Sequence, residues 1–154
     1  MIATLPSDID ILSYKERVPL VWVVFIGGTG TGKSTLFNRL CDHPVSLTGA
    51  ERPKTAGSIA YAYGNAPIDR RFPIPYLNRV RTRNAGPTAG EPGELMIFGH
   101  DRKTWSHLVF VDTPDLDSLR NENRRVAEDM YRLSDVVVFV TSQEKYADLI
   151  PHQF

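Results

Sequence analysis

The sequence predicts an α/β domain, a three-layer sandwich in which helices cover both faces of a mostly parallel sheet. Residues 21–26 and 136–140 carry this prediction because they are continuous runs of β-branched and aromatic residues. Such runs are typical of strands buried on both faces of a parallel sheet. A glycine-rich segment follows the first run, and a helical pattern then extends from Lys33 to about Cys41. This order of strand, glycine-rich loop and helix supports the same fold class.

Residues 1–19 are expected to lead into the domain, which we place at 20–154. Ser7 can cap a short helix, and Pro19 prevents that helix from running into the first strand. Three residues of this helix are expected to face inward: Ile9, Leu12 and Tyr14. The helix after the glycine-rich segment is expected to have an apolar side formed by Leu36, Phe37, Leu40 and Cys41.

The middle of the chain is expected to be its least regular part. Residues 43–57 read as a loop, and 59–63 can form a short strand. Residues 64–93 are rich in proline, glycine and arginine and predict a long irregular insertion, which is usually functional or disordered. We predict that 94–98 and 108–111 pair as an antiparallel hairpin at the sheet edge. A last helix is predicted by apolar residues that recur on one face: Leu119, Val126, Met130 and Leu133.

The composition excludes several classes of protein. The 154 residues include 18 Lys+Arg and 18 Asp+Glu, a balance that argues against a general polyanion binder, and 42% hydrophobic residues exclude wholesale disorder. The lone Cys41 excludes a disulfide framework and a cysteine zinc cluster. Asp8 and Asp10 stand where a signal peptide would be basic and then apolar, and no apolar run is long enough to cross a membrane. We therefore expect a soluble cytoplasmic protein.

The glycine-rich segment at residues 27–34 fits the pattern G-x-x-x-x-G-K-[ST] completely. Its glycines let the backbone N–H groups surround a phosphate, and the following helix adds its positive end. Lys33 can reach the outer phosphates, and the Ser34 hydroxyl is placed to bind Mg²⁺. The pattern predicts the P-loop NTPase sandwich; the alternative, a plain glycine-rich turn, needs no Lys-Ser pair at its end. The predicted nucleotide-binding residues of this loop are Gly28, Thr29, Gly30, Thr31, Gly32, Lys33 and Ser34.

Two further residues can complete a magnesium site. Asp112 follows an apolar strand, and strands beside the first one deliver such a carboxylate near the same Mg²⁺, usually through a water. The alternative is that Asp112 caps the Thr113-Pro114 turn. Thr55 lies in the loop after the first helix of the domain, where a hydroxyl can close on Mg²⁺ and the terminal phosphate. The predicted magnesium ligands are Ser34, Thr55 and Asp112. The predicted catalytic residues are Lys33 and Thr55.

Three motifs resemble one group of proteins. They are K-S-T-L-F-N-R-L at 33–40, R-P-K-T at 52–55 and D-T-P-D-L at 112–116. With these motifs, residues 20–141 are similar to the Era-like and dynamin-like branch of translation-factor-type GTPases. The resemblance implies a GTP-binding protein, a slow Mg²⁺-dependent GTPase that acts as a molecular switch. It also implies that Lys33 binds the β and γ phosphates and that Thr35 touches the α-phosphate. By the same resemblance, switch II comprises Asp112, Thr113, Pro114, Asp115 and Leu116.

Three residues depart from the pattern of that family. Asp115 replaces the switch II glycine and adds a carboxylate near a polyanion, so we expect weak coupling of switch II to the γ-phosphate. The carboxylate can avoid the phosphate by turning outward, to Arg120 or to a magnesium-bound water. Leu116 stands where Ras-like members place a water-orienting glutamine. Gly30 stands where potassium-activated Era-like members carry asparagine, so we expect no potassium stimulation.

The guanine-reading motif N-K-x-D is absent, because no asparagine in the chain is followed by lysine. In the family this motif lies one strand beyond residues 136–140, so we expect the chain to be an incomplete G domain. Guanine specificity then rests on the resemblance alone. Two alternatives stay open: an ATP-using P-loop enzyme or nucleotide kinase, and a nucleotide-binding module whose hydrolysis has decayed.

The insertion at 64–93 carries a cluster of arginines near a single acid, Asp69. These are Arg70, Arg71, Arg79, Arg81 and Arg83. The cluster can contact a protein or RNA partner, or supply an arginine finger to the phosphates in cis. The alternative is a solvated loop, because aromatic residues that could stack on bases are sparse there.

Overall fold

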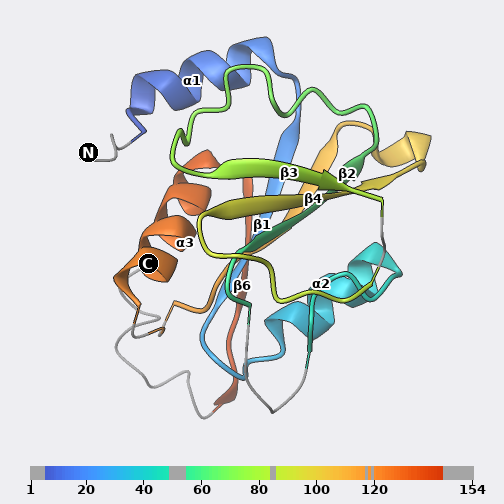
Figure 1. Ribbon diagram of the computed structural model, residues 1–154, viewed down its shortest axis with the longest axis vertical. Helices are drawn as coiled ribbons and strands as arrows, with labels where there is room; N and C mark the ends of the chain where they lie inside the picture. Colours follow the sequence, from blue (N-terminus) through green and yellow to red (C-terminus); the bar gives the residue numbers. More distant parts are fainter. Residues whose placement is uncertain (1–5, 49–54, 84–85, 117, 119, 144–154) are drawn as a thin grey trace.

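The computed structural model describes residues 6–48, 55–83, 86–116, 118 and 120–143. Its centre is a 6-stranded sheet with the strand order β3-β4-β2-β5-β1-β6 (Figure 1). The strands are β1 (Val21–Gly27), β2 (Ser58–Tyr63), β3 (Asn78–Thr82), β4 (Glu94–His100), β5 (Leu108–Asp112) and β6 (Val136–Val140). All neighbours are parallel except β2 and β5. The predicted mixed α/β fold with a mostly parallel sheet is therefore confirmed.

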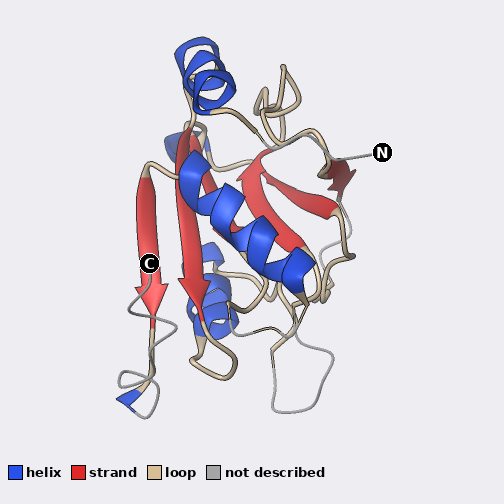
Figure 2. Cartoon of the chain, turned by 90° about the vertical axis from the view of Figure 1, so that its left-hand side faces the viewer, coloured by secondary structure: helices blue, strands red, loops and turns tan. Residues whose placement is uncertain are grey.

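The helices cover both faces of this sheet. They are α1 (Asp8–Arg17), α2 (Lys33–Cys41) and α3 (Asn121–Leu133), with a short 3₁₀ helix, η1 (Lys103–Trp105). Successive side chains of β1 alternate between two hydrophobic clusters, as the pleat of a strand requires. Trp22 and Val24 lie in the cluster that includes residues of α1 and α3, whereas Phe25 packs with Phe37 of α2. Figure 2 shows α3 lying across its face of the sheet.

The predicted hairpin of 94–98 with 108–111 is wrong. β2 lies between β4 and β5 and pairs with both of them, parallel to β4 and antiparallel to β5. The segment that joins β4 to β5 contains η1 and is longer than the two to five residues of a common hairpin loop. Length of connection, rather than strand pattern, therefore distinguishes these pairings.

The insertion is also more ordered than predicted. It contains β3, whose mixed polar sequence suits an edge strand, where one side of the ladder faces solvent. Before β3, Ile68, Ile74 and Leu77 are fully buried in the core. The segment is thus partly a structural layer of the domain rather than an irregular loop.

The helix faces were only partly predicted. Ser7 does cap α1, in a capping box with Asp10, but Ile9 and Leu12 are 76% and 63% exposed. The buried residues of this helix are Ile11 and Tyr14, and the Tyr14 hydroxyl donates a hydrogen bond to the Ile68 carbonyl at 3.1 Å. In α2, Phe37 and Cys41 are buried, but Leu36 and Leu40 are exposed. In α3, Val126, Met130 and Leu133 are buried as predicted, whereas Leu119 lies outside the described residues.

β6 forms one end of the sheet within the described residues. It pairs with β1, and its side chains Val136, Val137 and Phe139 are 46%, 38% and 40% exposed. No helix in the described part of the chain is long and apolar enough to cross a membrane.

Candidate nucleotide-binding site

The glycine-rich loop connects the end of β1 to the start of α2. Gly32 is the N-cap of α2 and has a φ of 87°, a left-handed conformation that a residue with a side chain rarely adopts. Gly32 has no side chain to cap this helix end, so it leaves the first backbone N–H groups available to a ligand. An uncapped helix start beside a glycine-rich turn is the backbone geometry that binds a phosphate.

Lys33 and Asp112 meet in the interior beside this loop. The Lys33 side chain is 3% exposed and that of Asp112 is 0% exposed, with 2.5 Å between Nζ and Oδ1. Lys33 Nζ also donates a hydrogen bond to the Thr113 carbonyl. These contacts join the first turn of α2 to the end of β5, because β1 and β5 are parallel neighbours whose carboxyl ends lie together.

The two hydroxyls predicted to bind Mg²⁺ also lie together. Ser34 Oγ and Thr55 Oγ1 are 3.3 Å apart, although the residues are distant in sequence, and Thr55 is 6% exposed. Two hydroxyls next to a Lys–Asp pair provide the hard oxygen donors that Mg²⁺ prefers. The residues present therefore fit this ion. Arg52, Pro53 and Lys54, which precede Thr55, lie outside the described residues.

Switch II is anchored at several points. The Thr113 hydroxyl donates to the Phe25 carbonyl at 2.8 Å, and the Leu116 N–H donates to the Gly27 carbonyl at 3.2 Å. Leu116 is 3% exposed and belongs to the hydrophobic core. Its side chain therefore packs inside the domain rather than facing the phosphate site.

The Asp115 side chain points toward the phosphate loop rather than outward, the alternative that the sequence left open. Its Oδ2 accepts a hydrogen bond from the Thr29 hydroxyl at 3.0 Å, and its Oδ1 lies 3.9 Å from Lys33 Nζ. Its side chain is 14% exposed. The cation of Lys33 and the hydroxyl of Thr29 attract the carboxylate inward.

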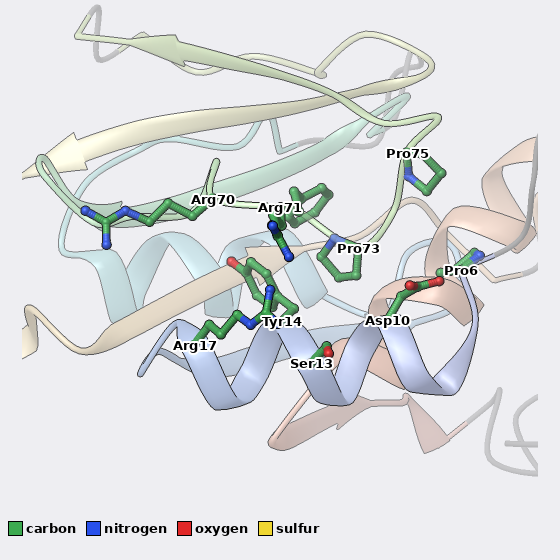
Figure 3. A pocket seen from close by; sticks show the side chains of 10 residues that line it. Pro6, Asp10, Ser13, Tyr14, Arg17, Arg70, Arg71, Pro73 and Pro75 are labelled. Carbon is green, nitrogen blue, oxygen red and sulfur yellow. The ribbon is translucent and has the colours of Figure 1, made fainter.

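The arginines of the insertion lie away from this site. Arg79 and Arg81 form ion pairs with Asp69. They belong to the edge strand β3, which is separated from β1 by β4, β2 and β5. Arg70 and Arg71 line a cleft of about 390 Å³ together with Arg17 of α1 (Figure 3). That cleft adjoins α1, which precedes β1, whereas the phosphate loop follows β1 (Figure 1). The structure therefore does not support an arginine finger from these residues.

Two residues of the site were missed by the sequence reasoning. Ser46 Oγ donates a hydrogen bond to Asp112 Oδ2 at 2.7 Å, and the Asn38 side chain holds the Ser46 backbone. Asn38 stands in the K-S-T-L-F-N-R-L motif, which could have signalled a role for it. Nothing in the sequence around Ser46 distinguishes this residue from other loop serines. Thr35, assigned to the α-phosphate by resemblance, is exposed on the first turn of α2.

Comparison with known proteins agrees with this geometry. The family model described as 50S ribosome-binding GTPase matches residues 22–153. The match covers the phosphate loop, Thr55, Asp112 and switch II, but it does not confirm the Era-like branch. A comparison with curated proteins finds no match. The P-loop, the Lys33–Asp112 pair and the range of the match agree, and the chain belongs to the 50S ribosome-binding GTPase family of GTP-binding proteins with a P-loop G domain.

Proposed function

We propose that this chain is a molecular switch that binds GTP with Mg²⁺ and hydrolyses it slowly. The observation that carries the proposal is the convergence of Lys33, Ser34, Thr55 and Asp112, four residues from three parts of the chain, beside one uncapped helix start. The family membership favours GTP over the alternative of an ATP-using P-loop enzyme.

Each residue has a proposed role. The loop N–H groups and Lys33 bind the β and γ phosphates, and Thr35 contacts the α-phosphate. Ser34, Thr55 and Asp112 hold Mg²⁺, directly or through its waters. When bound, this ion neutralises the charge that develops on the phosphate oxygens.

Slow hydrolysis follows from switch II. The side chain of Leu116 is buried, so it cannot orient an attacking water as a glutamine does in Ras-like proteins. Both carboxylates of switch II approach the phosphate loop: Asp112 pairs with Lys33, and Asp115 accepts a hydrogen bond from the Thr29 hydroxyl. Positioning and electrostatics are then the main catalytic effects that remain.

The insertion is a candidate partner surface. In the described part of the chain, no carboxylate forms an ion pair with Arg17, Arg70 or Arg71, and all three line the cleft in Figure 3. We propose that this cleft contacts an acidic surface of a protein or RNA partner, because guanidinium groups bind carboxylates and phosphates well.

The first test concerns Lys33. Replacing it by alanine alone would leave the buried Asp112 charged and unpaired, which costs several kcal/mol and confuses binding with folding. We therefore compare Asp112→Asn with the double variant Lys33→Ala/Asp112→Asn. Loss of the lysine should weaken GTP binding about 100-fold, since charge-assisted hydrogen bonds contribute about 1.5–3 kcal/mol each.

Lys103→Ala in the same background is the matched control, because Lys103 is exposed on η1. Calorimetry gives the affinities, and competition with ATP gives the preference for the base. Equal GTP affinity with and without Lys33 would rule out the proposed phosphate site, and equal competition by ATP would rule out a GTP-specific switch.

A further inference from the structure

The Asp112 carboxylate has a second partner besides Lys33. Its Oδ1 lies 2.5 Å from Lys33 Nζ, and its Oδ2 accepts a hydrogen bond from Ser46 Oγ at 2.7 Å. Asp112 is 0% exposed and Ser46 is 1% exposed. A buried carboxylate without partners is very unfavourable, so each of these two contacts matters to it.

The position of Ser46 is fixed by α2. The Ser46 N–H donates to Asn38 Oδ1 at 2.8 Å, and Asn38 Nδ2 donates to the Ser46 carbonyl at 2.7 Å. Asn38 lies on the same helix as Lys33 and Ser34. Ser46 is therefore held at a fixed place relative to the phosphate loop.

The insertion holds Ser46 from another side. Ser46 forms a β-bridge with Thr88, in which the Leu47 N–H donates to the Thr88 carbonyl at 2.8 Å. The next residue of the insertion, Ala89, accepts a hydrogen bond from the Ala56 N–H at 2.6 Å. Residues 88–89 thus pair with the chain on both sides of the 48–55 segment, which ends at Thr55. We call residues 88–91 the clasp.

Lys33 and Ser46 differ in whether they keep their contact with Asp112 when nucleotide binds. On the proposed function, Lys33 leaves Asp112 to bind the phosphates of GTP. Ser46 keeps its hydrogen bond to Asp112, because Asn38 and Thr88 fix the position of its backbone. We propose that Ser46 is a positioning residue, whose hydroxyl keeps the Asp112 carboxylate oriented toward the magnesium shell after Lys33 has moved.

The test measures magnesium rather than hydrolysis. The Mg²⁺ concentration that gives half-maximal binding of a fluorescent GTP analogue should rise about tenfold in Ser46→Ala, as is typical when a hydrogen bond to a metal ligand is lost. Binding of the analogue in EDTA should not change, because the Ser46 hydroxyl donates its hydrogen bond to Asp112 and acts on the magnesium side of the site. In an Asp112→Asn background, Ser46→Ala should have little further effect, since the two residues act as one unit.

Ser58→Ala is the matched control. Ser58 is 0% exposed like Ser46, but its hydroxyl has no hydrogen-bond partner in the described residues. The Mg²⁺ concentration for half-maximal binding to the Ser58→Ala variant should equal that of the wild type. Ser46→Ala can unfold at the assay temperature while Ser46→Ala/Asp112→Asn remains folded. This result would show that the hydroxyl stabilises the buried charge of Asp112, which supports the inference.

Three outcomes would overturn the positioning role of Ser46. A magnesium requirement of Ser46→Ala within twofold of Ser58→Ala removes the positioning role and leaves the proposed function intact. An equal effect of Ser46→Ala with and without the Asp112 charge shows that Ser46 does not act through this residue. If the wild type does not bind GTP in a Mg²⁺-dependent way, the proposed function fails first, and the inference fails with it.

Discussion

On the proposed function, Asp115 places a negative charge beside the lysine that binds the γ-phosphate. Its carboxylate accepts a hydrogen bond from Thr29 and lies 3.9 Å from Lys33 Nζ. A γ-phosphate that approached the same lysine would meet this charge. Two like charges about 4 Å apart cost about 1 kcal/mol in water and several times more in a partly dry site.

We expect Asp115→Asn to raise GTP affinity relative to GDP affinity by about tenfold, which corresponds to about 1.4 kcal/mol. The substitution preserves the shape of the side chain and removes only its charge. Asp115→Gly should give a similar or larger gain, because glycine is the residue that the resembling family carries there. Titration with GTP and GDP measures both affinities.

Asp101→Asn is the control for this comparison, since Asp101 is exposed beyond β4. An unchanged ratio of GTP to GDP affinity in both Asp115 variants would mean that the carboxylate is harmless and that the switch follows the family pattern.

Single residues also show what the sequence could predict of the site. The proximity of Lys33 to Asp112 and of Ser34 to Thr55 agrees with the order of the motifs, whereas the roles of these residues stay predictions. Ser46 was not predictable, because its role depends on a hydrogen bond that only the folded chain creates. The inward direction of Asp115 was also missed, because it depends on the local charge of Lys33.

Among the elements, the clasp lies against the backbone of Gly57 with no room for a side chain. A Cβ atom added to Gly57 would lie 2.1 Å from the Glu91 carbonyl oxygen, closer than any real contact. Gly90 faces the same point with a φ of 70°. The clasp therefore needs glycine on the Gly57 side in order to approach the segment after Thr55.

Gly57→Ala should separate the clasp from this segment. We expect it to lower the free energy of unfolding by about 1–3 kcal/mol, as overpacking does, and thermal unfolding measures this. Gly86→Ala is the control within the same insertion, because a Cβ there meets nothing within 4 Å. Equal stability of the two variants would show that the close approach is not needed.

The helices and strands differ in how well the sequence pattern predicts their bounds and their partners. β1 and α2 were predictable within a residue or two because apolar runs and the phosphate-loop motif define both ends. The partners of β4 and β5 were not predictable, because strand pairing depends on contacts remote in sequence. The exposed side chains of Ile9 and Leu12 show that a short helix can bury either of two stripes; here Ile11 and Tyr14 form the buried one.

At the scale of the whole molecule, β1 separates two candidate anion-binding regions. The arginine-lined cleft adjoins α1 before this strand, and the phosphate loop follows it. A strand of 7 residues spans about 23 Å at about 3.3 Å per residue. This distance exceeds the screening length of about 8 Å at physiological salt.

Arg70→Glu should therefore leave GTP affinity within about twofold of the wild type in 0.15 M salt, although it reverses a charge. The Lys33→Ala/Asp112→Asn variant provides the contrasting large effect in the same calorimetric assay. A several-fold change in GTP affinity caused by Arg70→Glu would show that the cleft and the nucleotide site are coupled.

The contact between Lys33 and Asp112 has a consequence for how nucleotide enters. The ammonium donates two of its three N–H groups to internal acceptors, the Asp112 carboxylate and the Thr113 carbonyl. On the proposed function, entry of GTP is then an exchange of acceptors at this nitrogen, in which phosphate oxygens replace internal ones. The net affinity is the difference between two similar sets of hydrogen bonds, so a change in the departing acceptors adjusts it as directly as a change in the loop itself.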